Sequence, residues 1–119
     1  MANILVVDHD RVFSHVLASL LRGKGHKVLS AIDAVQGAML AMKSPPDAII
    51  LDINMPAGSG EDCMHKLRMS ARTSKIPIIV LSGGSDATAK KTLAHHGAAA
   101  TLSKPLVPSE LFIALDTIL

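Results

Sequence analysis

The sequence predicts an α/β fold, a doubly wound five-stranded parallel sheet with helices on both faces. Short aliphatic runs alternate five times with amphipathic stretches, and parallel strands need such crossover helices between them. Three of the runs are almost continuously apolar, as expected for strands that are buried on both faces. With 119 residues and no linker or internal repeat, we expect a single domain over residues 1–119.

The first half of the chain predicts two strand–helix units. Residues 4–7 form the first strand, and the helix after it carries an apolar stripe at helical spacing: Val12, Phe13, Val16, Leu17, Leu20 and Leu21. A glycine turn at residues 23–25 ends this helix, and residues 27–30 predict the second strand. The second helix covers about residues 34–42, with Asp33 as its N-cap and a Ser-Pro-Pro sequence after it.

The second half predicts three more units of the same kind. The expected strands cover residues 48–51, 78–81 and 100–102. The expected helices cover about residues 59–69, 86–96 and 108–119. Gly97 suits the end of the fourth helix, and Pro108 suits the first turn of the fifth.

The composition argues against several classes of function. The chain has a formal net charge of +2 with acids and bases interspersed, so no basic patch for nucleic acid is expected. It has no Trp or Tyr and only two Phe, which disfavours stacking platforms for bases or flavins. The core must therefore be aliphatic.

The same features predict a cytoplasmic protein without a membrane segment. The single cysteine, Cys63, excludes an internal disulfide and fits a reducing compartment. The first residues lead directly into a strand rather than a signal peptide, and no apolar run has the length of a membrane span.

Polar side chains follow four of the five predicted strands. They are Asp8, His9 and Asp10 after the first strand, Asp52 after the third, Ser82 after the fourth and Lys104 after the fifth. Because parallel strands end at one edge of the sheet, ligands of such folds bind at that edge. We therefore expect these side chains to lie close together.

This set of groups suits phosphoryl chemistry on an aspartate. Carboxylate oxygens from Asp8 and Asp52 suit Mg²⁺, which typically keeps its other sites for water and phosphate. Lys104 supplies a positive charge for a phosphate oxygen, and Ser82 supplies a hydrogen bond. An aspartate can attack phosphorus to give an acyl phosphate, and the sequence therefore predicts phosphorylation of Asp52.

Each residue also has a plainer explanation. Asp52 and Ser82 could belong to turns, Asp10 could cap the first helix, and Lys104 could be a solvated lysine before a turn. Four independent coincidences at the same end of one sheet are improbable, and this favours the chemical interpretation.

The order and spacing of these residues resemble the receiver family of response regulators in two-component signalling, over essentially the whole chain. The segments that carry the resemblance are residues 4–8, residues 51–56 with Gly60 after them, residues 76–82, and residues 104–105. The resemblance implies a flavodoxin-like sheet with strand order 2-1-3-4-5.

The resemblance also assigns roles to individual residues. It implies a phosphoacceptor at Asp52, a metal ligand at Asp8, a backbone carbonyl ligand at Asn54 and a switch hydroxyl at Ser82. Lys104 takes the place of the phosphate-contacting lysine, and the peptide bond before the proline that follows it is typically cis in this family.

Two positions depart from the pattern of the family. His9 stands where the family usually has a second acid, and a neutral imidazole is a poor ligand for Mg²⁺. We therefore expect weaker Mg²⁺ binding, unless Asp10 turns inward as a replacement ligand; His9 itself is the other candidate. Thr101 stands where the family commonly has an aromatic residue that turns inward on switching, so the mode of signalling is expected to differ.

The resemblance implies a switch that catalyses only its own phosphorylation and dephosphorylation, with Mg²⁺ as cofactor and Mn²⁺ as an alternative. The expected partners are a sensor histidine kinase or a histidine phosphotransfer protein as phosphodonor, and a protein effector downstream. Neither nucleic acid nor a membrane is expected as a partner, and we expect a monomer or a weak dimer.

Two alternatives remain open. A pseudo-receiver would have the same fold but act as a phosphorylation-independent binding module, and His9 and Thr101 motivate this reading. A haloacid-dehalogenase-like phosphatase would use Asp8 as nucleophile and Asp10 as acid and base, but the later acidic pair that it needs is missing. A flavodoxin-like cofactor carrier is discarded for lack of flavin-stacking aromatics and a phosphate loop.

Overall fold

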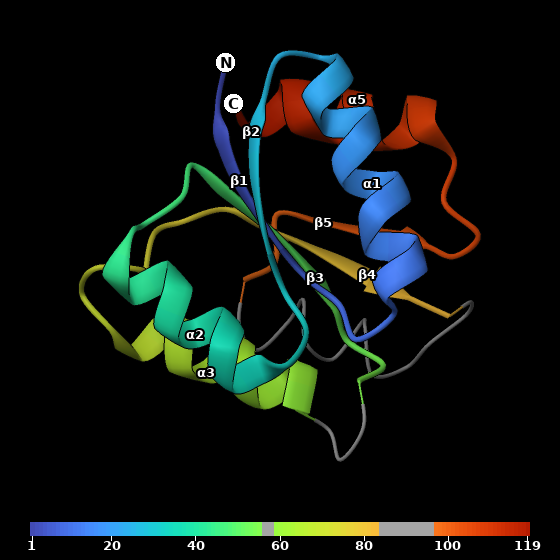
Figure 1. The fold of residues 1–119 in the computed structure, drawn as a ribbon. Coiled ribbons are helices and arrows are strands. Elements are labelled where there is room, and N and C mark those ends of the chain that lie inside the picture. The colour runs from blue at the N-terminus through green and yellow to red at the C-terminus, as the bar shows by residue number, and fades with distance from the viewer. Residues whose placement is uncertain (56–58, 84–96) are drawn as a thin grey trace.

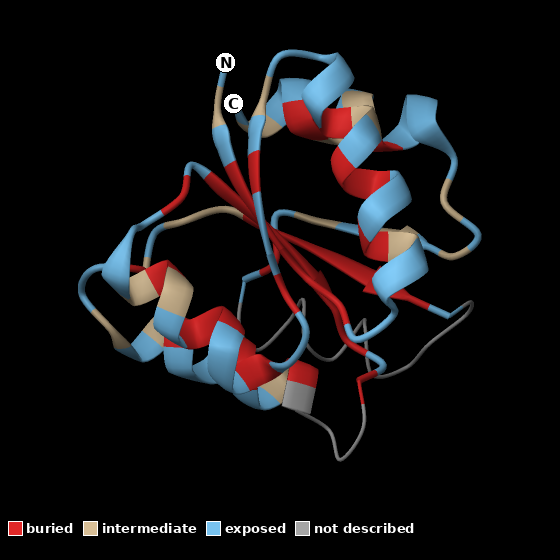
Figure 2. Ribbon diagram, in the orientation of Figure 1, coloured by how far each residue is buried: buried red, intermediate tan, exposed pale blue. Residues whose placement is uncertain are grey.

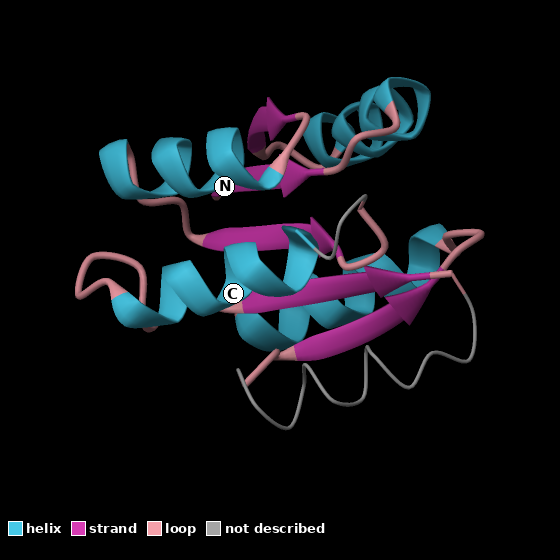
Figure 3. Cartoon of the chain, turned by 90° about the horizontal axis from the view of Figure 1, so that it is seen from below, coloured by secondary structure: helices cyan, strands magenta, loops and turns pink. Residues whose placement is uncertain are grey.

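A computed structural model of the chain describes residues 1–55, 59–83 and 97–119. Its centre is a five-stranded parallel sheet in the order β2-β1-β3-β4-β5, as predicted (Figure 1). The strands are β1 (Asn3–Val7), β2 (Lys27–Ala31), β3 (Ala48–Asp52), β4 (Ile78–Ser82) and β5 (Ala100–Ser103). The arrows of the central strands in Figure 3 point the same way, so the carboxyl ends of these strands share one edge of the sheet.

Helices cover both faces of the sheet. The described helices are α1 (Arg11–Gly23), α2 (Ala34–Lys43), α3 (Ser59–Met69) and α5 (Pro108–Ile118). In Figure 1, α1 and α5 lie on one face of the sheet, and α2 and α3 lie side by side on the other. The helix predicted over residues 86–96 lies outside the described residues, and Gly97 after it has a φ of 65°, as a residue that ends a helix often does.

The core consists of two aliphatic layers, one on each face of the sheet. Successive strand residues alternate between them: Ile4 and Val6 pack toward α1 and α5, while Leu5 and Val7 pack toward α2 and α3. All residues of β3 and β4 are buried, and Figure 2 shows these strands as the buried centre of the molecule. This burial on both faces explains why both strands are nearly continuous apolar runs.

The predicted helix boundaries are confirmed by their caps. Asp10 accepts a hydrogen bond from the N–H of Phe13 at 3.0 Å and so caps α1. Asp33 caps α2 in the same way, through the N–H of Gln36 at 2.8 Å. Pro108 begins α5, where its missing N–H costs no helical hydrogen bond.

Gly60 lets the first turn of α3 pack directly against the end of β3. A Cβ atom at residue 60 would lie 2.6 Å from the carbonyl oxygen of Asp52 and 2.8 Å from the Cα of Ile53. Both atoms belong to the backbone and cannot move aside cheaply. Glycine therefore sets how closely α3 approaches the strand that carries Asp52.

The two chain ends lie side by side (Figure 1). Met1, Ala2, Ile118 and Leu119 line the same hollow at the surface. Since β1 begins there and the strands run away from it, the ends lie opposite the carboxyl edge of the sheet. Within the described ranges, we find no helix with both the length and the apolar character of a membrane span.

Candidate phosphorylation and metal site

The register of the sheet brings the predicted residues together. Val7 of β1 pairs with Leu51 of β3, so Asp8 follows beside Asp52. Ser82 at the end of β4 pairs with Ser103 of β5. The backbone N–H of Lys104 then donates to the Ser82 carbonyl at 2.7 Å, which holds the lysine at the same edge.

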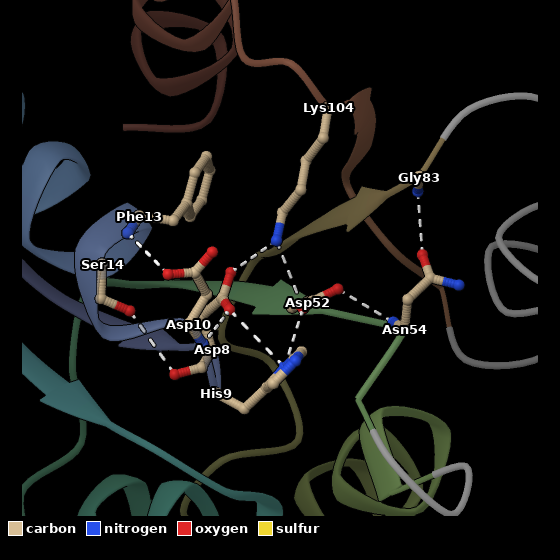
Figure 4. Close-up of polar contacts among 9 residues, drawn as sticks. All are labelled: Asp8, His9, Asp10, Phe13, Ser14, Asp52, Asn54, Gly83 and Lys104. Carbon is tan, nitrogen blue, oxygen red and sulfur yellow. Dashed lines mark hydrogen bonds and ion pairs between the residues drawn. The ribbon is translucent and has the colours of Figure 1, made fainter.

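Asp8 and Asp52 are buried carboxylates with exposed fractions of 0% and 1%. Each is oriented by a backbone amide two residues further along the chain. The N–H of Asp10 donates to Asp8 Oδ1 at 2.9 Å, and the N–H of Asn54 donates to Asp52 Oδ1, also at 2.9 Å. The second oxygen of each carboxylate faces Lys104 (Figure 4).

Lys104 connects the two carboxylates through one ammonium group. Its Nζ lies 2.9 Å from Asp8 Oδ2 and 3.3 Å from Asp52 Oδ2. The Phe13 ring lies against the same ammonium, 4.3 Å from ring centroid to Nζ. Burial lowers the pKa of Lys104, but hydrogen bonds and charge attraction from the two aspartates outweigh it and raise its pKa above the ordinary value.

Asp8 retains an uncompensated cost of burial. Desolvation raises the pKa of this carboxyl, and the charge of Asp52 raises it further. Hydrogen bonds from the Asp10 amide and from Lys104 lower the pKa but do not cancel the effect of burial. Asp8 is therefore a carboxylate that would gain from a further positive charge.

His9 is the third group around this pair. Its Nδ1 lies 3.5 Å from Asp52 Oδ2 and 3.8 Å from Asp8 Oδ1, and its side chain is half-exposed. Donor atoms of Asp8, His9 and Asp52 all lie within 4.8 Å of one another, so one cation could be shared by the three after small movements. The two carboxylates fit a hard divalent cation, whereas the imidazole nitrogen is a softer donor.

Asp10 and Asn54 lie next to the site but have other partners. The carboxylate of Asp10 is used by the cap of α1, and in the described part of the chain it is not in the cluster of close metal donors. The side-chain oxygen of Asn54 accepts from the N–H of Gly83 at 2.9 Å, which ties the ends of β3 and β4 together. The metal-ligand roles of Asp10 and of the Asn54 carbonyl stay predictions.

The two predicted switch residues lie in different surroundings. Ser82 is buried at the end of β4, with an exposed fraction of 1%. Thr101 lies in β5, pairs in register with Val80, and is exposed. Ser82 thus lies at the same edge of the sheet as Asp52, while Thr101 faces solvent.

Sequence reasoning missed two contributors to the site. Phe13 was assigned to the apolar stripe of α1, yet its ring contacts the ammonium of Lys104. The only signal in the sequence is an aromatic residue one turn after the acidic residues that follow β1. The backbone N–H of Gly83 is the second, and no side-chain pattern could have revealed it.

The peptide bond between Lys104 and Pro105 is cis, as the resemblance implied.

Comparisons with known proteins agree with this arrangement. Residues 4–116 match the sequence model described as the response regulator receiver domain. The protein PilH of Pseudomonas aeruginosa is 33% identical over 119 residues, which covers all of this chain and 98% of PilH. The chain spans about half the length of several longer relatives that are transcriptional regulators.

Two solved structures show the likeness in three dimensions. The chemotaxis protein CheY4 of Vibrio cholerae has a TM-score of 0.92 and 29% identity, with 100% of this chain and 99% of that chain covered. The receiver domain of the sensor histidine kinase PA1611 of Pseudomonas aeruginosa has a TM-score of 0.89 and 26% identity, over 98% of this chain and 96% of that chain. That structure is described as having a magnesium ion coordinated in its active-site cleft.

Proposed function

Since the chain belongs to the response regulator receiver family of two-component signalling, we propose that it is a phosphoacceptor switch phosphorylated on Asp52. The phosphodonor is a phosphohistidine on a sensor histidine kinase or on a histidine phosphotransfer protein. Members of this family act as signalling switches rather than as classical enzymes. The observation that carries the proposal is the ammonium of Lys104, 3.3 Å from the carboxylate of a buried aspartate.

The proposed reaction is a transfer between two side chains. A carboxylate oxygen of Asp52 attacks phosphorus, the P–N bond to the donor imidazole breaks, and the imidazole nitrogen takes up a proton. The N–H of Asn54 keeps the Asp52 carboxylate in one orientation during the attack. Lys104 stands beside the acceptor, where it can contact an oxygen of the arriving phosphoryl group and offset its negative charge.

Asp8 and Asp52 are the proposed ligands of a divalent cation, with the carbonyl of Asn54 as a further ligand. A cation bound there supplies positive charge that offsets the carboxylates and the phosphoryl group. Mg²⁺ is the first candidate by analogy with the receiver domain of PA1611, and Mn²⁺ is the alternative. The raised pKa of Asp8 supports this role, because a cation relieves the cost of its buried charge.

The switch itself is proposed to work through Ser82. Its hydroxyl would donate a hydrogen bond to a phosphoryl oxygen and so favour one of two conformations, which a downstream protein effector then recognises. The main-chain hydrogen bond from Lys104 to Ser82 supports this coupling, because it links the backbones of the two residues proposed to contact the phosphoryl group. The exposed Thr101 has no ring to bury, so the effector must read a different change of the surface.

We further propose that the domain, residues 1–119, acts in the cytoplasm as a monomer or weak dimer, where a sensor kinase presents its phosphohistidine.

Intact mass after incubation with acetyl phosphate and Mg²⁺ tests this function. The parent chain and an Asp116→Asn variant, which loses an exposed acid of α5 beside the chain ends, are expected to gain one phosphoryl group. Asp52→Asn is expected to gain none. If the parent gains none with Mg²⁺ or Mn²⁺, the proposal is wrong and the chain is a pseudo-receiver.

A further inference from the structure

His9 adds a nitrogen donor to the pair of buried carboxylates. With bonds of about 2.0–2.2 Å, two ligands of one octahedral ion lie about 3 Å apart when adjacent and about 4 Å apart when opposite. The Nδ1 atom of His9 already lies 3.5 Å from Asp52 Oδ2 and 3.8 Å from Asp8 Oδ1. Only small side-chain movements are needed to bring all three residues onto one ion.

The backbone around His9 is fixed while its ring is not. Asp8 before it is buried and bonded to the N–H of Asp10, and Asp10 after it caps α1. The ring of His9 is half-exposed at the rim of the site and faces the carboxylates (Figure 4). Hydrogen bonds therefore hold the backbone on both sides of His9, and its half-exposed ring can rotate toward a cation that enters from solvent.

Lys104 and His9 lie near different oxygens of Asp8, whereas both lie near Oδ2 of Asp52. Lys104 contacts Asp8 Oδ2, whereas His9 lies nearer Asp8 Oδ1. Asp8 Oδ1 accepts one amide hydrogen bond and keeps a second lone pair for a metal. An ion on the side of His9 can thus bind Asp8 without displacing the ammonium, which a cation bound at Asp8 Oδ2 would have to do.

This donor set favours a different class of metal from an all-oxygen site. Mg²⁺ binds oxygen and gains little from imidazole, whereas imidazole suits Fe, Co, Ni, Cu and Zn, and carboxylates suit Mn as well. Because His9 replaces a possible third carboxylate, we expect the affinity to fall for Mg²⁺ relative to the softer ions. The loss of a carboxylate and the gain of an imidazole both shift the preference of the site away from Mg²⁺ and toward softer ions.

We propose that His9 coordinates the metal of this site together with Asp8 and Asp52, and that the site prefers a transition-metal ion, Co²⁺ above Mn²⁺, to Mg²⁺. This inference rests on the proposed function, because it concerns the metal of the same site. It goes further than that function because it adds His9 as a ligand and predicts a class of metal that a site with acids alone would not prefer.

The test uses the full chain stripped of metal and titrated separately with Mg²⁺, Mn²⁺ and Co²⁺. Pulsed electron paramagnetic resonance of the Mn²⁺ form detects a bound nitrogen directly. His9→Asp restores an all-oxygen set, His9→Asn removes the imidazole without adding charge, and His15→Asn is the matched control, an exposed histidine on α1.

We expect nitrogen coupling to Mn²⁺ in the parent and in His15→Asn, and its loss in both His9 variants. The ratio of Co²⁺ affinity to Mg²⁺ affinity should fall about tenfold or more in His9→Asp, in line with the softness of the lost donor. Absence of nitrogen coupling in the parent, or an unchanged affinity ratio in His9→Asp, overturns the proposal.

These outcomes are separate from those of the phosphorylation test. A parent that takes up phosphoryl on Asp52 but shows no nitrogen at Mn²⁺ keeps the proposed function and refutes the role of His9. A parent that shows nitrogen coupling but takes up no phosphoryl group keeps the metal site and refutes the phosphoacceptor.

Discussion

The buried charge of Asp8 lowers the stability of the fold at the position where we propose that a metal binds. It is a buried carboxylate whose charge is only partly offset by the Asp10 amide and by Lys104, so its pKa is raised by folding. The folded chain therefore keeps the proton of Asp8 to a higher pH than the unfolded chain does. The contribution of Asp8 to the free energy of unfolding then falls as pH rises from 3.8 through the raised pKa.

An Asp8→Asn variant removes this cost and should be more stable than the parent in the absence of metal. We expect a gain of about 1 kcal/mol in the free energy of unfolding at neutral pH, because a buried charge whose desolvation is only partly offset is replaced by a neutral group of the same shape, while Asp52 stays as a partner of Lys104. The gain should shrink toward zero below pH 3.8, where the parent is protonated in both states. Urea denaturation across this pH range measures it.

With added divalent metal, the parent should become the more stable of the two proteins. The metal binds the folded parent, whereas Asp8→Asn lacks one of its proposed ligands. Asp116→Asn, which removes an exposed acid beside the chain ends, should change the free energy of unfolding by less than about 0.5 kcal/mol with or without metal. A variant that is less stable than the parent at neutral pH without metal would show that the bond to Lys104 outweighs the burial of Asp8.

For individual residues, the sequence indicated which acids and which lysine lie close together. A residue that directly follows a buried parallel strand must lie at the carboxyl edge of the sheet. Asp8, Asp52, Ser82 and Lys104 could be predicted in this way, and the structure brings them to one edge. Phe13 could not, because a helical stripe does not distinguish a core aromatic from one that contacts an ammonium. The orientation of His9 likewise depends on side-chain rotation, which no periodicity encodes.

Among the elements, the junction between β3 and α3 leaves no room for a side chain at residue 60. Gly60→Ala places a methyl group 2.6 Å from the backbone oxygen of Asp52. We expect a loss of about 2 kcal/mol in the free energy of unfolding, the usual scale for overpacking, and slower phosphorylation as the end of β3 shifts. Urea denaturation and the rate of mass gain with acetyl phosphate measure the two effects.

Gly23→Ala is the matched control for this substitution. Gly23 ends α1, and a Cβ atom there has no neighbour within 4 Å. The free energy of unfolding of Gly23→Ala should therefore equal that of the parent or be slightly higher, since alanine favours the helix. Equal effects of the two alanines would mean that the close contact at Gly60 relaxes without cost.

The positions of the strands and helices were predicted more accurately from the sequence than the side-chain contacts were. Each observed strand is one residue longer than its predicted range, at one end or the other, and the caps at Asp10 and Asp33 begin the helices where expected. Burial on both faces produces a strong apolar signal in β3 and β4. The signal is weakest for β5, whose residues are only partly buried or exposed.

In the molecule as a whole, the central strand β3 joins the two halves of the core. Ile50 packs in the layer under α1 and α5, and its neighbour Leu51 packs in the layer under α2 and α3. Both side chains are fully buried. The two layers are therefore joined through one backbone, and we expect them to unfold together.

Ile50→Ala and Leu51→Ala should each lower the free energy of unfolding by about 2–5 kcal/mol, as large-to-small changes in a core do. Both should keep a single unfolding transition seen identically by circular dichroism and by calorimetry. Leu29→Ala, on the edge strand β2 with 53% of its surface exposed, should change stability by less than about 0.5 kcal/mol. Two separate transitions in either core variant would show that the layers unfold independently.

The neighbouring chain ends have a practical consequence for handling the molecule. Met1 and Leu119 lie beside each other, at the edge of the sheet opposite Asp52. A surface tether or a fluorescent tag attached at either end would leave the carboxylate edge open to a docking kinase. A short linker could also join the two ends, so that new ends are opened elsewhere and the order of the elements is permuted without moving the site.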